Sequence, residues 1–232
     1  MKKRNHNIDI IKGLAIIAVI LIHSLSEEVL LAILSPLYIW QAVPVFMLLA
    51  GYNTAASFQR RGYASLNQFY NMSFLYSKVE RLLYPFLFIW IIQVIVHFVM
   101  LDGLSFTSLV TSLLTGGWGP GSYFILVIIQ ATLILPLIYM LVKKSLTAGT
   151  IALFFISILV DAFCMLIDVP GSVYRVIVVR YIFALVLGVW LALNPKKINY
   201  RWLIPLAIVS AVYIVGVYYC LLYTSDAADD SL

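Results

Sequence analysis

Apolar runs long enough to cross a membrane recur along this chain, and they limit its possible folds more than any other feature. The sequence is 63% hydrophobic and only 11% charged, whereas ordinary soluble domains carry about 25% charged residues. A bilayer core of about 30 Å needs roughly 20 apolar residues in a helix, and the alternating pattern of a membrane β-barrel is absent. We therefore predict an all-α fold, a polytopic transmembrane helix bundle.

Seven segments of the chain meet this length requirement, with ranges expected at 8–25, 37–58, 82–101, 123–142, 148–167, 173–193 and 202–222. We predict that they form a single transmembrane domain over residues 1–222. Beyond this point the chain turns abruptly acidic and rich in small side chains. We expect residues 223–232 to be a disordered or non-native tail.

The net charge of +5 is distributed between the spans in a regular way. Basic side chains precede the first span and follow the second, fourth and sixth, whereas the intervening loops carry acidic ones. This alternation is the positive-inside pattern, and it places the N-terminus in the cytoplasm. Topology in a cell membrane therefore explains the charge, and no nucleic-acid partner is predicted. The basic residues are Lys2, Lys3, Arg4, Lys12, Arg60, Arg61, Lys78, Arg81, Lys143, Lys144, Lys196, Lys197 and Arg201, and the acidic ones are Glu27, Glu28, Asp102 and Asp168.

Two connecting segments are too long for tight turns. Residues 59–81 place aromatic and apolar side chains among polar ones, which predicts an amphipathic helix on the inner membrane surface. Residues 102–122 include a glycine-rich run at 116–121, which indicates irregular backbone that packs closely or approaches a ligand.

Lys12 and His23 lie at either end of the apolar part of the first span. Eleven residues at 100° each bring the two side chains to nearly the same face of a helix, about 16 Å apart along its axis. An ionisable side chain within a membrane is costly and is a candidate functional residue by default. A neutral imidazole at His23 could accept a proton from a hydroxyl group; the structural alternative is an interhelical hydrogen bond. For Lys12 the alternative is a cation that extends to the lipid headgroups.

Other chemistry-bearing residues leave both functional and structural interpretations open. His97 and Gln93 form an i, i+4 pair on the third span, which is consistent with a cavity lining or with interhelical hydrogen bonds. Cys164 and Cys220 lie in apolar surroundings and predict neither a disulfide nor a metal site. The sequence has no phosphate-binding loop, dinucleotide fingerprint, zinc spacing or serine elbow, so no metal is predicted.

Arg175 and Arg180 are basic residues outside the predicted cytoplasmic clusters. They fall in the outer half of the sixth span, where each guanidinium needs a carboxylate, phosphate or carbonyl partner. Asp161 or Asp168 could serve as a structural partner. The roles of the two arginines are left open.

Several motifs, in order along the chain, resemble the membrane acyltransferase-3 family. That family typically opens with Asp-x-x-Arg-Gly-Leu-Ala and a histidine eleven residues after the arginine; here residues 9–15 read Asp-Ile-Ile-Lys-Gly-Leu-Ala, and His23 follows. Residues 43–52, 78–85, 118–124 and 181–188 resemble later family elements. Lys12 replaces the family's arginine, which keeps the charge but loses the planar fork of the guanidinium. Family members commonly have about ten spans, so we expect seven spans to be a fragment truncated at its C-terminus.

The resemblance implies an integral-membrane O-acyltransferase, in particular an O-acetyltransferase. The donor would be acyl-CoA, chiefly acetyl-CoA, and the acceptor a hydroxyl of a cell-surface carbohydrate or another envelope molecule. It implies that His23 is the catalytic base and that Lys12 and Arg81 hold the anionic nucleotide part of coenzyme A, although a positive-inside anchor explains Arg81 equally well. The alternative is a membrane transporter or flippase component for an envelope precursor or small solute, whose signature would be inverted repeats or paired broken helices.

Overall fold

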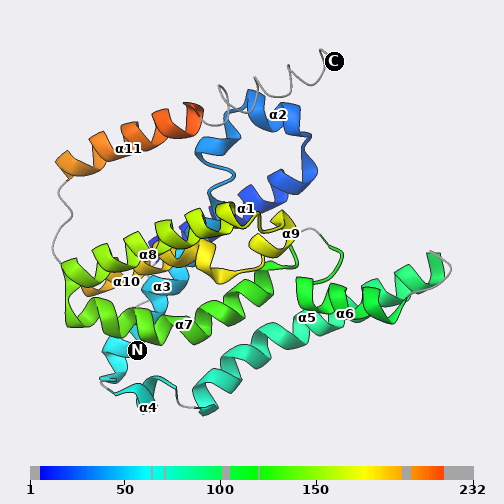
Figure 1. Ribbon diagram of the computed structural model, residues 1–232, viewed down its shortest axis with the longest axis horizontal. Helices are drawn as coiled ribbons and strands as arrows, with labels where there is room; N and C mark the ends of the chain where they lie inside the picture. The colour runs from blue at the N-terminus through cyan, green and yellow to red at the C-terminus, as the bar shows by residue number, and fades with distance from the viewer. Residues whose placement is uncertain are drawn as a thin grey trace. The chain divides into compact units, whose positions relative to one another are not determined.

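The computed structural model describes residues 6–63, 65–70, 72–100, 105–119, 121–194 and 200–216. Every regular element within these ranges is a helix, as the sequence predicts. Four of the helices are long and apolar enough to cross a membrane (Figure 1): α1 (His6–Ser24), α5 (Met72–Met100), α7 (Phe124–Lys144) and α8 (Leu146–Leu166). The expected tail at 223–232 lies outside the described residues.

The chain divides into two compact units. The first unit comprises residues 1–46 and 195–232. It contains α1, α2 (Glu27–Ala32), the 3₁₀ helix η1 (Ser35–Leu37), the start of α3 (Ala42–Arg61) and α11 (Tyr200–Val215). Both α2 and α11 pack against η1. The Ser35 carbonyl oxygen accepts hydrogen bonds from the amides of Tyr38, Ile39 and Trp40. The helix η1 and the turn that follows it therefore occupy the beginning of the predicted second span.

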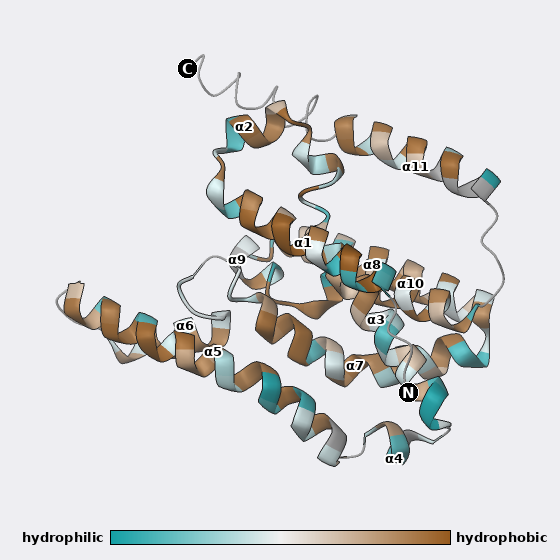
Figure 2. Ribbon diagram, turned by 180° about the vertical axis from the view of Figure 1, so that it is seen from behind, coloured by the Kyte–Doolittle hydropathy of each residue, from teal (hydrophilic) through white to brown (hydrophobic). Residues whose placement is uncertain are grey.

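The second unit, residues 47–194, holds most of the core. It contains the rest of α3, α4 (Leu66–Phe69), α5, α6 (Phe106–Thr115), α7, α8, α9 (Gly171–Tyr174), the 3₁₀ helix η2 (Val178–Tyr181) and α10 (Ile182–Leu193). The helices α7, α8 and α10 pack against one another, and Figure 2 shows apolar residues along most of their length. Their interface buries large apolar side chains, among them Val127, Leu135, Leu185 and Val189.

Two glycines allow α3 and α10 to approach backbone to backbone. A Cβ added at Gly51 would collide with the Leu185 carbonyl oxygen, and one added at Gly188 would collide with the Leu48 carbonyl oxygen. The same Cβ at Gly188 would also lie 2.8 Å from the Tyr52 amide nitrogen. Small residues let membrane helices approach closely and gain van der Waals contact, so these two positions fix the crossing of α3 and α10.

The predicted amphipathic helix over residues 59–81 is wrong. The chain instead ends α3 at Arg61, makes the single-turn helix α4, and begins α5 at Met72. The Phe69 side chain is only 1% exposed, and its ring lies 4.8 Å from the Phe58 ring and 5.4 Å from the Tyr139 ring, measured between centroids. Phe69, one of the residues that suggested a membrane-surface helix, therefore packs into the core between α3, α4 and α7.

The predicted sixth span is interrupted near its start. Where one helix over 173–193 was expected, α9 ends at Tyr174 and η2 begins at Val178. The irregular backbone between them is paired with Gln130 of α7: the Gln130 side chain donates to the Val176 carbonyl oxygen at 2.9 Å and accepts from the Val178 amide at 3.1 Å. Non-helical backbone at membrane depth is tolerated only where protein or a water-filled cavity satisfies its polar groups, and Gln130 meets that need.

Candidate functional site

Lys12 and His23 both lie on α1, as the sequence predicts. His23 occupies the last turn of the helix and its side chain is exposed, while Lys12 is half-exposed. Helical geometry places the two side chains within about 20° of each other around the helix axis. The face that carries them is therefore a candidate polar face, with a cation near one end and an imidazole near the other.

The first unit also contains an apolar cavity of about 360 Å³. Neither Lys12 nor His23 is among its lining residues, and the lining residues Leu14, Ile17 and Leu21 lie on the opposite side of the helix. The candidate polar face and the cavity are thus separate features of α1. The lining residues are Ile11, Leu14, Ala15, Ile17, Ala18, Leu21, Tyr38, Ile39, Ala42 and Val45.

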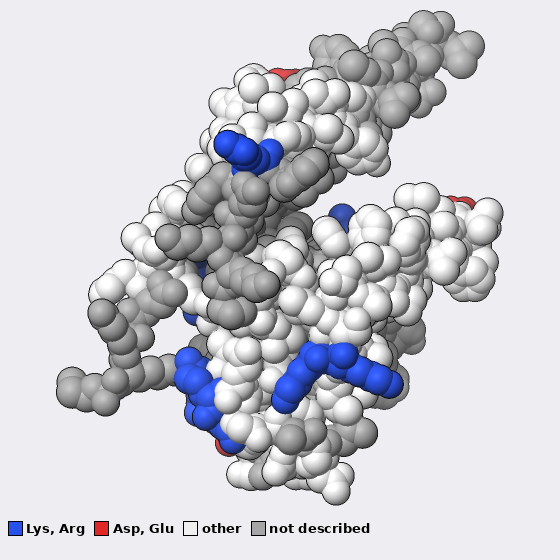
Figure 3. Space-filling view, turned by 90° about the vertical axis from the view of Figure 1, so that its left-hand side faces the viewer, with Lys and Arg blue, Asp and Glu red and all other residues white. Residues whose placement is uncertain are grey.

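The second unit carries two basic pairs at one end, which we call the basic end. It is defined by the basic pairs Arg60–Arg61 at the end of α3 and Lys143–Lys144 at the end of α7. The Phe58 and Tyr139 rings, two and four residues before these pairs, lie 5.3 Å apart. The Lys143 ammonium lies 5.6 Å from the centre of the Tyr139 ring. Figure 3 looks onto this end and shows basic side chains gathered there.

Arg81 and Lys78 lie in the first turns of α5, which begins beside the basic end. Arg81 is exposed. Lys78 is half-buried, and its ammonium lies 3.5 Å from the Thr54 hydroxyl of α3. Sequence reasoning treated Lys78 as a topological charge alone, and its packing against α3 was missed. An exposed Arg81 can meet an anion from outside the protein, whereas Lys78 is tied to the helix pair.

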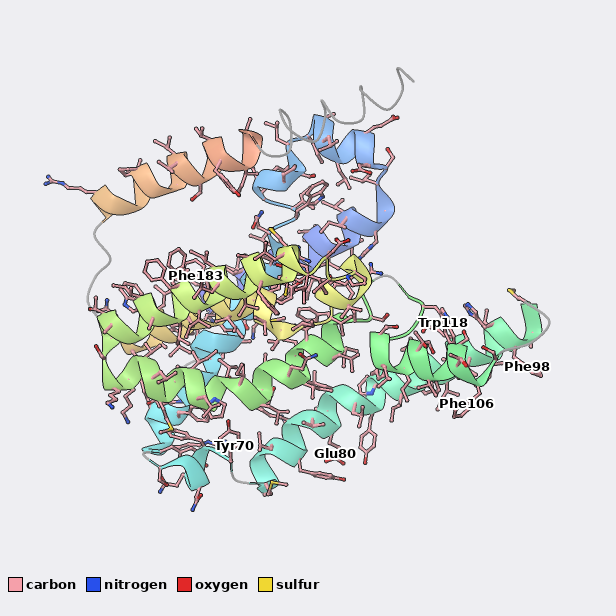
Figure 4. All side chains as sticks on the ribbon, viewed as in Figure 1. Tyr70, Glu80, Phe98, Phe106, Trp118 and Phe183 are labelled. Carbon is pink, nitrogen blue, oxygen red and sulfur yellow. The ribbon has the colours of Figure 1, made fainter. Side chains whose placement is uncertain are left out.

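His97 and Gln93, proposed as a cavity lining or a structural pair, both contact the glycine-rich loop. The His97 ring stacks on the Trp118 ring, with centroids 4.3 Å apart and planes 19° apart. The Gln93 side-chain oxygen accepts from the Trp118 amide at 3.3 Å. The structure thus favours the structural role of the pair, because both side chains hold the loop on α5. Figure 4 shows Trp118 on this loop, beside α5 and α6.

The glycines on either side of Trp118 explain the composition of this loop. A Cβ added at Gly117 would lie 2.7 Å from the Gln93 side-chain oxygen, and one added at Gly119 would lie 2.6 Å from its nitrogen. The loop backbone therefore closes around the Gln93 amide, and a side chain at either position would require the Gln93 side chain to move. The predicted close packing of this segment is confirmed, and its close partner is Gln93.

Asp161 does not pair with an arginine as the sequence suggested. It accepts a hydrogen bond from the Tyr174 hydroxyl at 2.7 Å. The Arg180 guanidinium lies over the Tyr174 ring at 5.3 Å and the Tyr181 ring at 5.7 Å.

Gln130 was also missed by sequence reasoning. A long polar side chain within the apolar run of the fourth predicted span is the signal that could have found it, because such a group needs a partner inside the membrane protein. The sequence does not say that the partner is backbone 46 residues further along the chain.

These helices define a polytopic membrane protein that carries an ionisable pair on its first span. The family model described as "Acyltransferase domain" (acyltransferase-3) matches residues 5–228, and the chain belongs to this family. No curated protein and no solved structure matches the chain.

Proposed function

We propose that this protein transfers an acyl group, in particular an acetyl group, from acyl-CoA to a hydroxyl of a cell-surface carbohydrate or another envelope molecule. The observation that carries the proposal is the acyltransferase-domain match over residues 5–228, which includes α1 with Lys12 and His23 on one face. The family supplies the reaction class. The donor, the acceptor and the residue roles are our proposal.

In this proposal His23 is the general base. Its neutral imidazole accepts the proton of the acceptor hydroxyl as that oxygen attacks the acyl carbonyl carbon, either of the thioester or of a relayed acyl group. When the thioester reacts directly, its carbon–sulfur bond breaks and the proton passes from the imidazolium to the departing thiolate. The exposed position of His23 on α1 leaves the ring open to an acceptor.

Lys12 and Arg81 are proposed to hold the anionic nucleotide part of coenzyme A. A lysine offers a point charge and an arginine a planar fork, and both are suited to phosphate oxygens. Arg81 is exposed, and Lys12 lies about 16 Å from His23 along α1. That separation suits a donor whose nucleotide part lies far from its thioester.

Replacing the proposed base tests the assignment. His23→Ala, expressed in a strain that lacks the native copy, should lower acylation of the surface acceptor about 10²- to 10⁴-fold, the usual contribution of general-base catalysis. Mass spectrometry of the released surface glycan measures the acylation. Ser24→Ala changes the adjacent exposed residue and should keep normal acylation. Normal acylation by His23→Ala at equal abundance would refute the role of His23.

A different measurement distinguishes a transporter from an acyltransferase. Transfer of label from radioactive acetyl-CoA to an acceptor in isolated membranes is expected for the acyltransferase. Uptake of a solute without such transfer would favour a transporter. Within the described residues the predicted sixth span is interrupted between α9 and η2. The transporter signature requires a matched pair of such broken helices.

A further inference from the structure

Arg175 and Arg180 lie toward the end of the second unit that is opposite its basic end. Helix α8 begins directly after Lys144 and Ser145 and runs for 21 residues, about 31 Å. Asp161 lies fifteen residues into α8, about 22 Å from its start, and it binds Tyr174, over whose ring Arg180 lies. Arg180 therefore lies near the last third of α8, whose length matches the thickness of the bilayer core.

Both arginine side chains are exposed at this depth. Among the described residues neither makes an ion pair: Asp161 accepts from Tyr174 instead, and Asp168 is exposed beyond the end of α8. Arg180 is restrained by the rings of Tyr174 and Tyr181. Restraint of a guanidinium lowers the entropy that it loses when it binds a partner.

An exposed guanidinium without a carboxylate is unfavourable at this place for two reasons. It is costly to keep the charge within the hydrocarbon region unless an anion or water reaches it. Two arginines at the end opposite the lysine pair also run against the charge distribution that orients membrane helices. Their presence indicates an anionic partner that the described side chains do not supply.

We propose that Arg175 and Arg180 bind the phosphate of a membrane-lipid headgroup. A guanidinium presents paired N–H donors that match two phosphate oxygens and form strong charge-assisted bonds. A lipid phosphate arrives with its own acyl chains, so it can reach exposed cations near the membrane boundary. This binding site is separate from the proposed acyl transfer and does not depend on it.

Native mass spectrometry of the detergent-solubilised full chain tests the site. The probe is dioleoyl phosphatidylglycerol, compared with dioleoylglycerol, which has the same tails and no phosphate. We expect phosphatidylglycerol alone to remain bound, and we expect Arg175→Gln and Arg180→Gln each to weaken the first binding event about tenfold. Arg180→Lys keeps the charge but loses the fork and should bind at an intermediate level. Lys144→Gln makes the same charge change at the basic end and should bind as the wild type does.

Three results of this binding comparison would overturn the proposal. They are equal binding of the phosphate-free lipid, undiminished binding by both glutamine variants, and an equal loss in Lys144→Gln. Among the described residues the Arg175 side chain makes no ion pair or ring contact, so Arg175→Gln keeps the test valid even if Arg180→Gln fails to fold. Excess soluble glycerol phosphate separates the two sources of phosphate: failure to displace the lipid supports a headgroup site, and full displacement would show that free phosphate suffices and overturn it.

Discussion

Polar side chains in this protein differ in what they contact, and Gln130 has the clearest structural partner. It pairs with one backbone carbonyl and one backbone amide at the break before η2. His23 and Arg81, in contrast, are exposed. Mutation of a polar residue that is bonded within the fold should therefore lower stability, whereas mutation of one that is available to a ligand should lower binding or activity.

Gln130→Leu should destabilise the protein by about 3 kcal/mol. The substitution leaves the Val176 carbonyl and the Val178 amide without a partner, and each unsatisfied buried group costs about 1–3 kcal/mol. Unfolding in detergent, followed by circular dichroism, measures the loss. Leu137→Ala on the same helix, where the side chain is 46% exposed, is the control and should cost under about 0.5 kcal/mol. Equal stability of Gln130→Leu and wild type would contradict the bracing role of Gln130.

Lys12→Gln and Arg81→Gln should each raise the KM for acyl-CoA about tenfold with little change in kcat, because each removes a contact that donor binding uses before the reaction begins. Lys12→Arg keeps the charge and should keep donor affinity. Initial rates against acyl-CoA concentration, in membranes with equal protein abundance, provide the measurement. Lys144→Gln, a cation outside the proposed donor contacts, serves as the comparison. An unchanged KM in both glutamine variants would remove the nucleotide-binding role.

At the residue scale the sequence predicts candidates better than it predicts contacts. The spacing of Lys12 and His23 is sufficient to place them on one face of α1, because a single helix sets that geometry. The partners of Asp161, His97 and Lys78 come from other elements, namely α9, the glycine-rich loop and α3. Their packing depends on tertiary structure, which a spacing rule does not contain.

At the scale of elements, the crossing of α3 and α10 is the contact most sensitive to side-chain size. Gly51 and Gly188 each lie against a carbonyl oxygen of the facing helix. Added atoms cannot be absorbed by a side-chain rotation here, because the neighbouring atoms belong to backbone.

Gly188→Ala should cost about 1–3 kcal/mol of stability through overpacking. Gly171→Ala is the matched control, because nothing lies within 4 Å of a Cβ at that position. Thermal unfolding in detergent compares the two variants. A Gly188→Ala protein as stable as Gly171→Ala would mean that α3 and α10 are farther apart than the structure places them.

Helices α7 and α8 begin and end within two residues of the predicted fourth and fifth spans. Long apolar runs with basic ends define such helices from the sequence alone. Residues 59–81 show why an apolar pattern alone does not define every helix. An aromatic residue such as Phe69 suits a membrane surface and a protein core equally well, and only its contacts with Phe58 and Tyr139 decide between them.

At the scale of the whole molecule, the charge pattern predicts which end of the second unit faces the cytoplasm. The basic pairs of α3 and α7 share one end of this unit, which is the arrangement that the positive-inside rule requires. The orientation of that end in the cell is a prediction.

Cysteine labelling checks this orientation. In a background that lacks Cys164 and Cys220, Thr147→Cys at the start of α8 should react with a membrane-impermeant maleimide only after the cytoplasmic side is opened. Thr107→Cys in α6 should react in intact cells. Both threonines are exposed, so the two variants are matched in accessibility. The reverse labelling pattern would show that the N-terminus is outside.

The pairing of Gln130 with the break at 176–178 also constrains how the chain enters the bilayer during synthesis. The stretch that precedes α10 cannot partition into lipid alone, because its free carbonyl and amide are satisfied only by α7. Helix α7 leaves the ribosome first, so we expect it to remain close enough to pair with this stretch when α10 enters the bilayer.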